Sequence, residues 1–179
     1  DLNEIVERKF SGDKVDIRFL RNGSWNDVVV SLKPLPPSRM YSVQYEKKPR
    51  YIAFAGLIFQ PLDTNLFATS KFDDVTVRRL YTDYVSKGIF QEKKDIVILT
   101  QIEPDPVTSQ IDDFTGLAVE KIDGLPVRDL KHAYELLYAD NPPEFHVIEL
   151  HGAQRPVIIP SAKVDEANSR IQANYGINK

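Results

Sequence analysis

The sequence predicts an α+β fold that is divided into two unequal units. Apolar residues recur at every second position in some segments, as in strands, and at helical spacing in others. A stretch with four prolines, PLPPSRMYSVQYEKKPR at 34–50, separates the two units. The 179 residues are enough for one ordinary domain or for two small ones.

The first unit is predicted to be one helix followed by a β-hairpin. Apolar residues at helical spacing predict the helix over 2–10, and Gly12 ends it. Segments 15–20 and 25–32 have strand character and flank Asn22-Gly23, the dipeptide that best fits a tight primed turn. Because a helix and a hairpin cannot enclose a core, we expect this unit to be the last part of a larger domain.

The second unit carries the remaining predicted strands and helices. Asp123-Gly124 and His151-Gly152 mark turns between strands, Asp129 is the expected N-cap of one helix, and Gly176 ends another. Strands are expected at 51–54, 57–59, 96–102, 116–122, 145–148 and 157–159, and helices at 62–69, 73–88, 126–138 and 161–175. The expected domain boundaries are 1–34 for the end of a first domain, 35–50 for a linker and 51–179 for a second domain.

Composition and motifs argue against several classes of function. With 23 Lys and Arg against 26 Asp and Glu, the net charge is −3, so the chain lacks the positive charge of a general nucleic-acid binder. Cys is 0, and no apolar run is long enough to span a membrane. His132, His146 and His151 have no third ligand at metal spacing, and no serine-hydrolase motif is present. We therefore expect no enzyme activity, metal or cofactor in this chain.

One segment has a pattern that favours peptide binding. Gly56 follows a short apolar run and leads into the apolar strand Leu57-Ile58-Phe59. A glycine-led turn of this kind can direct successive backbone N–H groups at the terminal carboxylate of a peptide. The strand would then offer an edge to which the peptide adds, and a later helix would form the facing wall. The alternative is an ordinary glycine turn between two core strands.

Several motifs resemble the PDZ region of the HtrA/Deg (Do-like) serine proteases. Gly56-Leu57-Ile58-Phe59 resembles the Gly-Leu-x-Phe carboxylate-binding loop of PDZ domains, with Ile58 where the most typical members have a second glycine. Residues 51–62 and 119–132 are similar to two segments of the second, PDZ-like domain of these proteases. Residues 12–32 resemble the closing hairpin of the first PDZ domain. The resemblance covers nearly the whole chain.

The resemblance implies a small PDZ-like β-barrel or sandwich flanked by helices, preceded by the remnant of another PDZ domain. A trypsin-like protease domain upstream of residue 1 would hold the catalytic residues. This chain would then bind hydrophobic peptide segments by strand addition, regulate its own protease domain or hold a homo-oligomer together. The resemblance also implies a periplasmic, other extracytoplasmic or organellar location. The implied peptide-binding residues are Gly56, Leu57, Ile58 and Phe59 in the loop, and Leu130, Tyr134 and Leu137 in the helical wall.

Two features leave open a second hypothesis, a structural or oligomerisation module whose peptide groove is blocked. Pro61 lies two residues after Phe59 and shortens the edge that a ligand could use. The helical insertion at about 62–88 is long for a PDZ loop and could cover the groove.

Overall fold

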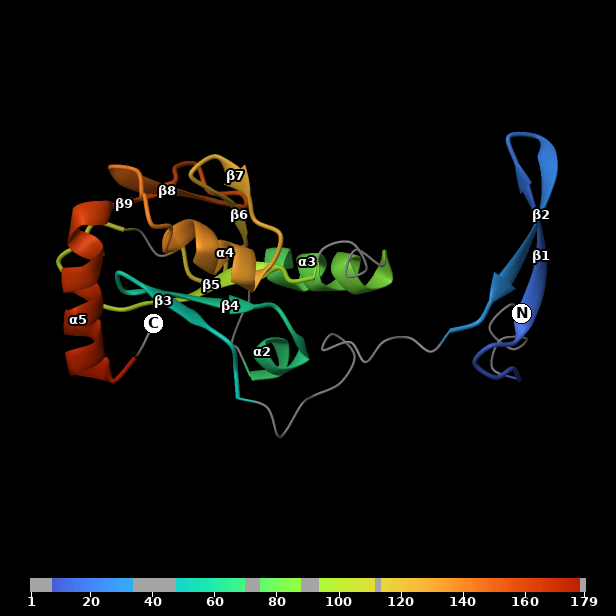
Figure 1. Cartoon of the computed structure of the whole chain (residues 1–179), viewed down its shortest axis with the longest axis horizontal. Helices are drawn as coiled ribbons and strands as arrows, with labels where there is room; N and C mark the ends of the chain where they lie inside the picture. Colours follow the sequence, from blue (N-terminus) through green and yellow to red (C-terminus); the bar gives the residue numbers. More distant parts are fainter. Residues whose placement is uncertain (1–7, 34–47, 70–74, 88–93, 112–113, 178–179) are drawn as a thin grey trace. The chain divides into compact units, whose positions relative to one another are not determined.

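A computed structural model describes most of the chain, namely residues 8–33, 48–69, 75–87, 94–111 and 114–177 (Figure 1). The chain divides into two compact units, Asp1–Ser38 and Arg39–Lys179, which are described separately below. Most of the predicted helix at 2–10 and of the predicted linker at 35–50 lies outside the described residues. The predicted division into three segments stays a prediction.

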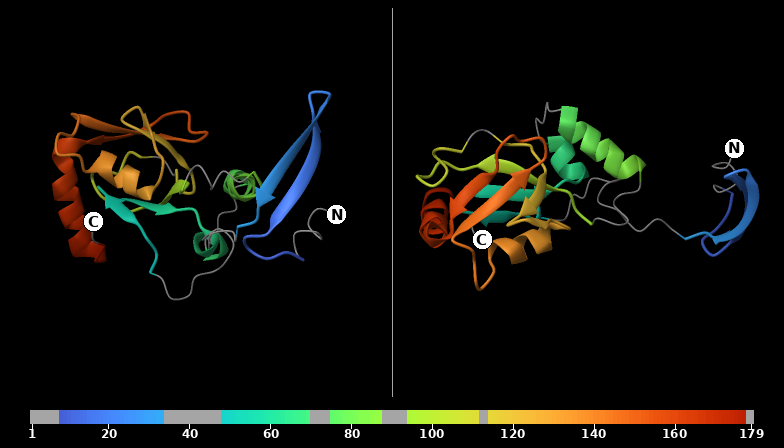
Figure 2. Two further views of the ribbon diagram at one scale, coloured as in Figure 1. Left: turned by 45° about the vertical axis from the view of Figure 1, so that its right-hand side comes forward. Right: turned by 90° about the horizontal axis from the view of Figure 1, so that it is seen from above.

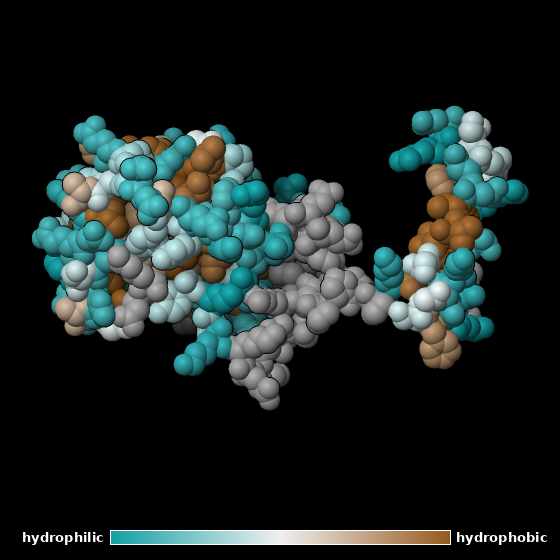
Figure 3. Space-filling view, in the orientation of Figure 1, coloured by the Kyte–Doolittle hydropathy of each residue, from teal (hydrophilic) through white to brown (hydrophobic). Residues whose placement is uncertain are grey.

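In the first unit, the predicted hairpin is confirmed. Strands β1 (Lys14–Arg21) and β2 (Ser24–Ser31) pair antiparallel along their whole length. Asn22 and Gly23, with φ of 52° and 76°, form the expected primed turn. Figure 3 shows hydrophobic atoms along this hairpin. The register gathers five apolar side chains on one face, Val15, Ile17, Phe19, Val28 and Val30.

The second unit contains two antiparallel sheets. The first has the order β3-β4-β5, with β3 (Ile52–Phe54), β4 (Leu57–Pro61) and β5 (Val97–Ile102). The second has the order β7-β6-β8-β9, with β6 (Val119–Ile122), β7 (Leu125–Pro126), β8 (Phe145–Leu150) and β9 (Val157–Pro160). Strand β4 is therefore the central strand of its sheet.

Helices flank these sheets, as the views in Figure 2 show. They are α2 (Thr64–Thr69), α3 (Val75–Ser86), α4 (Leu130–Leu137) and α5 (Val164–Tyr175), which follows the 3₁₀ turn η2 (Ser161–Lys163). The Asp129 carboxylate accepts the backbone N–H of His132 at 2.7 Å and caps α4 as predicted. Helix α4 begins later than predicted because Pro126 belongs to β7. Gly176, with φ of 68°, ends α5 as predicted. None of the described helices is long and apolar enough to cross a membrane.

The β3-β4-β5 sheet is buried on both faces. Alternate residues such as Phe54, Leu57 and Leu99 pack with the second sheet, α4 and α5 in the main core. Ile98 points to the opposite face and packs with Leu62 and Tyr84 in a second cluster that includes residues of α2 and α3. The described part of the helical insertion therefore packs on the far face of β5 and does not lie over the groove beside β4, while residues 70–74 and 88 of the insertion lie outside the described residues.

The second cluster fixes α3 through a fully buried tyrosine. Burial, together with the negative charge of Asp95, raises the pKa of Tyr84. The apolar stripe that predicts this helix thus faces β5 rather than a ligand. The α+β fold predicted from the sequence is confirmed.

Candidate functional site

The residues predicted to bind a peptide converge in space. Gly56 lies in the turn between β3 and β4, and Leu57 and Phe59 follow on β4. The side chains of Leu57 and Phe59 share the main core with Leu130 and Leu137 of α4. The sequence pattern thus identifies residues of β4 and α4 that do pack together, but the side chains of Leu57, Phe59, Leu130 and Leu137 are buried in the core.

The two remaining predicted residues lie elsewhere. Ile58 is 8% exposed and, because residues alternate along β4, points away from the main core. Tyr134 is 44% exposed on α4, where its ring lies 4.9 Å from the ring of Tyr138. Of the wall residues, only Tyr134 presents a large exposed surface.

The free edge expected along β4 is not present, because β3 pairs with it. Ile52, Ala53 and Phe54 face Phe59, Ile58 and Leu57 in antiparallel register, while β5 holds the other edge. The reason lies in the turn. Ala55 and Gly56 have φ of 48° and 92°, so two residues reverse the chain and β3 folds directly onto β4.

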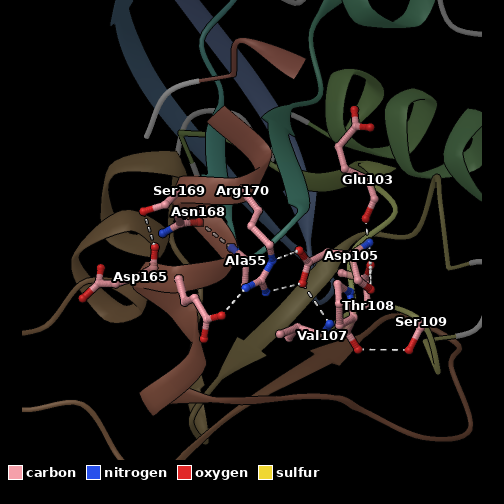
Figure 4. A network of polar contacts seen from close by, with 12 residues as sticks. Ala55, Glu103, Asp105, Val107, Thr108, Ser109, Asp165, Asn168, Ser169 and Arg170 are labelled. Carbon is pink, nitrogen blue, oxygen red and sulfur yellow. Dashed lines mark hydrogen bonds and ion pairs between the residues drawn. The ribbon is translucent and has the colours of Figure 1, made fainter. Parts of the chain in front are cut away.

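Two polar groups of this turn, the Ala55 N–H and the Gly56 carbonyl, have partners within the chain, and Figure 4 shows the bond from Ala55 to Asn168. The Ala55 N–H donates to the side-chain oxygen of Asn168 on α5 at 2.7 Å. The Gly56 carbonyl accepts the Glu103 N–H at 2.7 Å. A Cβ at Gly56 would lie 3.0 Å from the Thr108 side chain and 3.1 Å from the Glu103 carbonyl. The turn is therefore closed to a ligand carboxylate in this conformation.

The outer edge of β3 is covered by side chains. The Tyr138 hydroxyl donates to the Ala53 carbonyl and accepts the Asn168 side-chain N–H at 3.2 Å. The ring of Tyr138 also packs edge-on against Phe54, with centroids 5.4 Å apart. Burial raises the pKa of Tyr138 to about 12. Tyr138 and Asn168 therefore link α4 and α5 to the strand that fills the edge.

A second polar cluster holds the segment that covers the turn. Arg170 of α5 forms a two-pronged ion pair with the buried carboxylate of Asp105, at 2.7 and 2.9 Å. Hydrogen bonding to Arg170 is the main cause that lowers the pKa of Asp105. The Thr108 hydroxyl donates to the Glu103 carbonyl at 2.7 Å (Figure 4). These bonds fix residues 103–108 against α5.

The three histidines do not form one site. The buried His146 ring lies 2.7 Å from an Asp123 oxygen, and the exposed His151 ring lies 2.5 Å from a Glu120 oxygen. His132 lies on α4. Within the part of the chain that the structure describes, no group of three metal-binding side chains is found.

The sequence interpretation missed the residues that close the site. A usable signal was Asn168, since it lies on the apolar stripe of its helix between Val164 and Ile171. A polar residue at such a position predicts a buried hydrogen bond. No local pattern marks Tyr138 or the Asp105–Arg170 pair, whose partners are distant in sequence.

Comparison with known proteins agrees with this fold. The PDZ domain family matches residues 40–179. Three Arabidopsis thaliana relatives are putative protease Do-like 12, mitochondrial (29% identical over 135 residues), protease Do-like 2, chloroplastic (31% over 136) and protease Do-like 4, mitochondrial (30% over 137). These alignments cover 75%, 74% and 76% of this chain, but only 23%, 22% and 24% of the relatives.

The chain thus spans less than a quarter of the length of these relatives. The match falls in their PDZ region and not in their protease domain, so this segment corresponds to a non-catalytic part of such a protein. Together with the two-sheet fold and the helix beside β4, the match establishes that the chain belongs to the PDZ domain family, as the PDZ region of a Do-like (HtrA/Deg) protease.

Proposed function

We propose that this PDZ module supports the architecture of a larger Do-like protease and does not capture peptide tails at the Gly56 loop. The observation that carries the proposal is the pairing of β3 with β4. Strand addition requires a free edge. Here the chain's own β3 takes the place that an added peptide would need.

The closed turn supports the same proposal. Binding of a terminal carboxylate depends on backbone N–H groups that are free to donate. The Ala55 N–H is already paired with Asn168, and the turn is packed under residues 103–108. A ligand would have to displace β3 and detach α5 together, which would expose apolar core residues such as Phe54 and Ile171.

The parent protein, its partners and its location follow from the relatives as proposals. In this proposal the module packs against its own protease domain or against neighbouring subunits of a homo-oligomer. The mitochondrial and chloroplastic relatives favour an organelle as the location. Peptide hydrolysis would belong to the protease domain of the parent protein.

A peptide titration tests the closed groove. The isotopically labelled chain is titrated with a hydrophobic-tail peptide, acetyl-GSTVV with a free terminal carboxylate, while backbone amide shifts are recorded. We expect no saturable shifts at Gly56, Leu57 or Gln60 at millimolar peptide. Saturable shifts at those amides, absent with the amidated peptide, would overturn the proposal.

A variant that removes the hydrogen bond between Ala55 and Asn168 makes the test more specific. Asn168→Ala frees the Ala55 N–H but leaves β3 paired with β4. If β3 is the principal block, Asn168→Ala remains unable to bind the tail peptide. In the full-length protease, removal of residues 40–179 should change the number of subunits in the oligomer, obtained by dividing the mass measured by sedimentation by the mass of the shortened subunit. An unchanged number of subunits together with unchanged protease activity would contradict the architectural role.

A further inference from the structure

The sequence contains one Asn-Gly and one Asp-Gly dipeptide, and both form tight turns between paired strands. Asn22-Gly23 joins β1 to β2, and Asp123-Gly124 joins β6 to β7. Their backbones are nearly the same, with φ of 52° and 76° in the first turn and 53° and 77° in the second. A Cβ on either glycine would meet nothing within 4 Å. The two turns therefore form a matched pair that differs in what surrounds the first side chain.

Asn-Gly and Asp-Gly dipeptides share a reaction that needs no enzyme. The backbone nitrogen of the glycine loses its proton to hydroxide and attacks the side-chain carbonyl carbon, Cγ, of the preceding residue. With Asn, the new bond from Cγ to the backbone nitrogen closes a succinimide ring. The bond from Cγ to the side-chain nitrogen breaks, and this nitrogen takes a proton from water and leaves as ammonia. Glycine favours the attack because it has no Cβ to crowd the ring.

Water then opens the ring at either of its two carbonyl carbons. Opening at Cγ gives Asp, and opening at the backbone carbonyl gives isoaspartate, whose main chain runs through Cγ. The net change converts Asn and water to a carboxylic acid and ammonia. With Asp, the ring forms with loss of water, and the same opening gives isoaspartate without a change in mass.

The turn at Asn22 leaves both reacting groups accessible. Asn22 and Gly23 are exposed, and the side chain of Asn22 makes no hydrogen bond with the residues that the structure describes. The register pairs Arg21 with Ser24, so the Gly23 N–H lies outside the ladder of the hairpin. Hydroxide can therefore reach the Gly23 nitrogen, and the Asn22 side chain is free to turn toward it.

The Asp123 side chain is held away from the same reaction. One carboxylate oxygen accepts the Val147 N–H at 2.7 Å, and the other lies 2.7 Å from a ring nitrogen of His146. His146 is buried, and the Asp123 N–H donates to the Val147 carbonyl at 2.8 Å. These bonds fix Cγ of Asp123 against β8, so attack by the Gly124 nitrogen requires several of them to break.

A second exposed asparagine in the same hairpin provides an internal comparison. The side-chain N–H of Asn26 donates to the Ser24 carbonyl at 2.9 Å. The residue that follows is Asp27, whose Cβ crowds the ring and whose nitrogen belongs to β2. Asn26 should therefore react more slowly than Asn22 although both are exposed.

We propose that Asn22 is a site of spontaneous deamidation, which water converts to Asp or isoaspartate while the chain is folded. Isoaspartate adds one carbon to the main chain, so a two-residue turn no longer keeps Arg21 opposite Ser24. The modification therefore loosens the turn end of the β1-β2 hairpin. The proposal does not depend on whether the peptide site at Gly56 is closed.

The test follows all three sites in one sample of the 179-residue chain, kept at mildly alkaline pH. Cleavage after lysine gives peptide 15–33, which holds Asn22 and Asn26, and peptide 122–131, which holds Asp123. Mass spectrometry detects the gain in mass as NH₂ is replaced by OH, and fragmentation assigns the position. Chromatography separates isoaspartate from Asp. A parallel sample in urea gives the rates in the unfolded chain.

The expected result is a different effect of folding at each turn. Folding should slow the reaction at Asn22 by about tenfold at most, because an exposed turn opens at little cost. It should slow isoaspartate formation at Asp123 by about a hundredfold or more, because buried hydrogen bonds must break. In the folded chain Asn22 should react several times faster than Asn26, and its rate should rise with pH. Equal rates at Asn22 and Asn26, or protection of Asn22 as strong as that of Asp123, would overturn the proposal.

A variant tests the effect on the hairpin. Asn22→Gln keeps a side-chain amide, but its reaction would need a six-membered ring, so we expect no gain in mass at this position. Backbone amide signals of Arg21 and Ser24 are recorded in both isotopically labelled chains, fresh and after incubation. A second set of these signals should grow in the natural chain as isoaspartate accumulates and should not grow in Asn22→Gln. Unchanged signals in a chain that is mostly converted would contradict loosening of the hairpin.

Discussion

Two strand edges in the same domain are protected in different ways. At β3 and β4 the chain supplies its own strand and then covers that strand with Tyr138 and Asn168. At β9 it supplies no partner strand among the described residues. Because the Ser161 N–H points toward β8, alternation along the strand places Pro160, which has no N–H, at an outward amide position, and Pro156 lies just before the strand. The first solution removes the groove by filling it, whereas the second leaves a groove with few hydrogen-bonding groups. The peptide site expected from the sequence and the groove beside β9, which Val107, Ile111 and Ile158 help to line, are therefore different places.

The strongest way to break the closed edge is at its turn. Gly56→Val combines a positive φ of 92° with a Cβ placed 3.0 Å from Thr108 and 3.1 Å from the Glu103 carbonyl. We expect a loss of about 3 kcal/mol or more in the free energy of unfolding, measured by urea denaturation. The effect on folding would precede any effect on peptide binding.

Gly152→Val is the matched control for this prediction. Gly152 also has a positive φ, 77°, but a Cβ there meets nothing within 4 Å. It should cost about 1–2 kcal/mol from backbone strain alone. Equal losses in the two variants would show that the packing around Gly56 is unimportant.

The position of residues 103–108, which cover the Ala55-Gly56 turn, depends on the ion pair between Asp105 and Arg170. Asp105→Asn removes the charge of a buried side chain that pairs with Arg170 and should cost about 2 kcal/mol. Because folding lowers the pKa of Asp105 below its ordinary value of 3.8, its contribution is present above that value and is lost as pH falls through the lower folded pKa. Acid titration of stability should therefore be shallower in Asp105→Asn below about pH 4. An unchanged acid profile would contradict this role.

The sequence predicted most of the fold because its signals are local. Asn22-Gly23 identifies the first hairpin, Asp129 the start of α4 and Gly176 the end of α5. Each of these residues determines the backbone within a few positions of itself. The predicted elements in the described residues therefore lie close to the observed ones.

Whether the expected peptide site is open or closed could not be fully predicted from the same local signals. Gly56-Leu57-Ile58-Phe59 predicts a glycine turn and an apolar strand, and both are present. The pairing of β3 with β4 follows from the local turn at Ala55 and Gly56, as the alternative of an ordinary glycine turn between two core strands expects. The further closure of the turn depends on Asn168, which lies 113 residues from Ala55. Such long-range contacts leave little trace in one sequence. The roles predicted for the site residues remain predictions.

Asn168→Ala weakens the closed edge without placing a new group in it. The Ala55 N–H would lose its acceptor in a buried place, so we expect a loss of about 1–2 kcal/mol in urea denaturation. Hydrogen exchange of the Ala55 amide should also become faster. Ser169→Ala, at the next and exposed position of α5, should change neither measurement, and a matching effect there would indicate a general loss of helix stability.

Tyr138→Phe is the smallest of these changes because it removes only the hydroxyl that joins Ala53 to Asn168. We expect a loss of about 1 kcal/mol near neutral pH. The pH dependence carries the sharper test. Since folding raises the pKa of Tyr138 from 10.0 to about 12, its contribution is complete below pH 10 and is lost as pH rises toward 12. Tyr84, whose pKa is also raised, stays in both proteins, so the difference between their stabilities should shrink over that range because the buried Tyr138 hydroxyl must stay protonated in the folded chain.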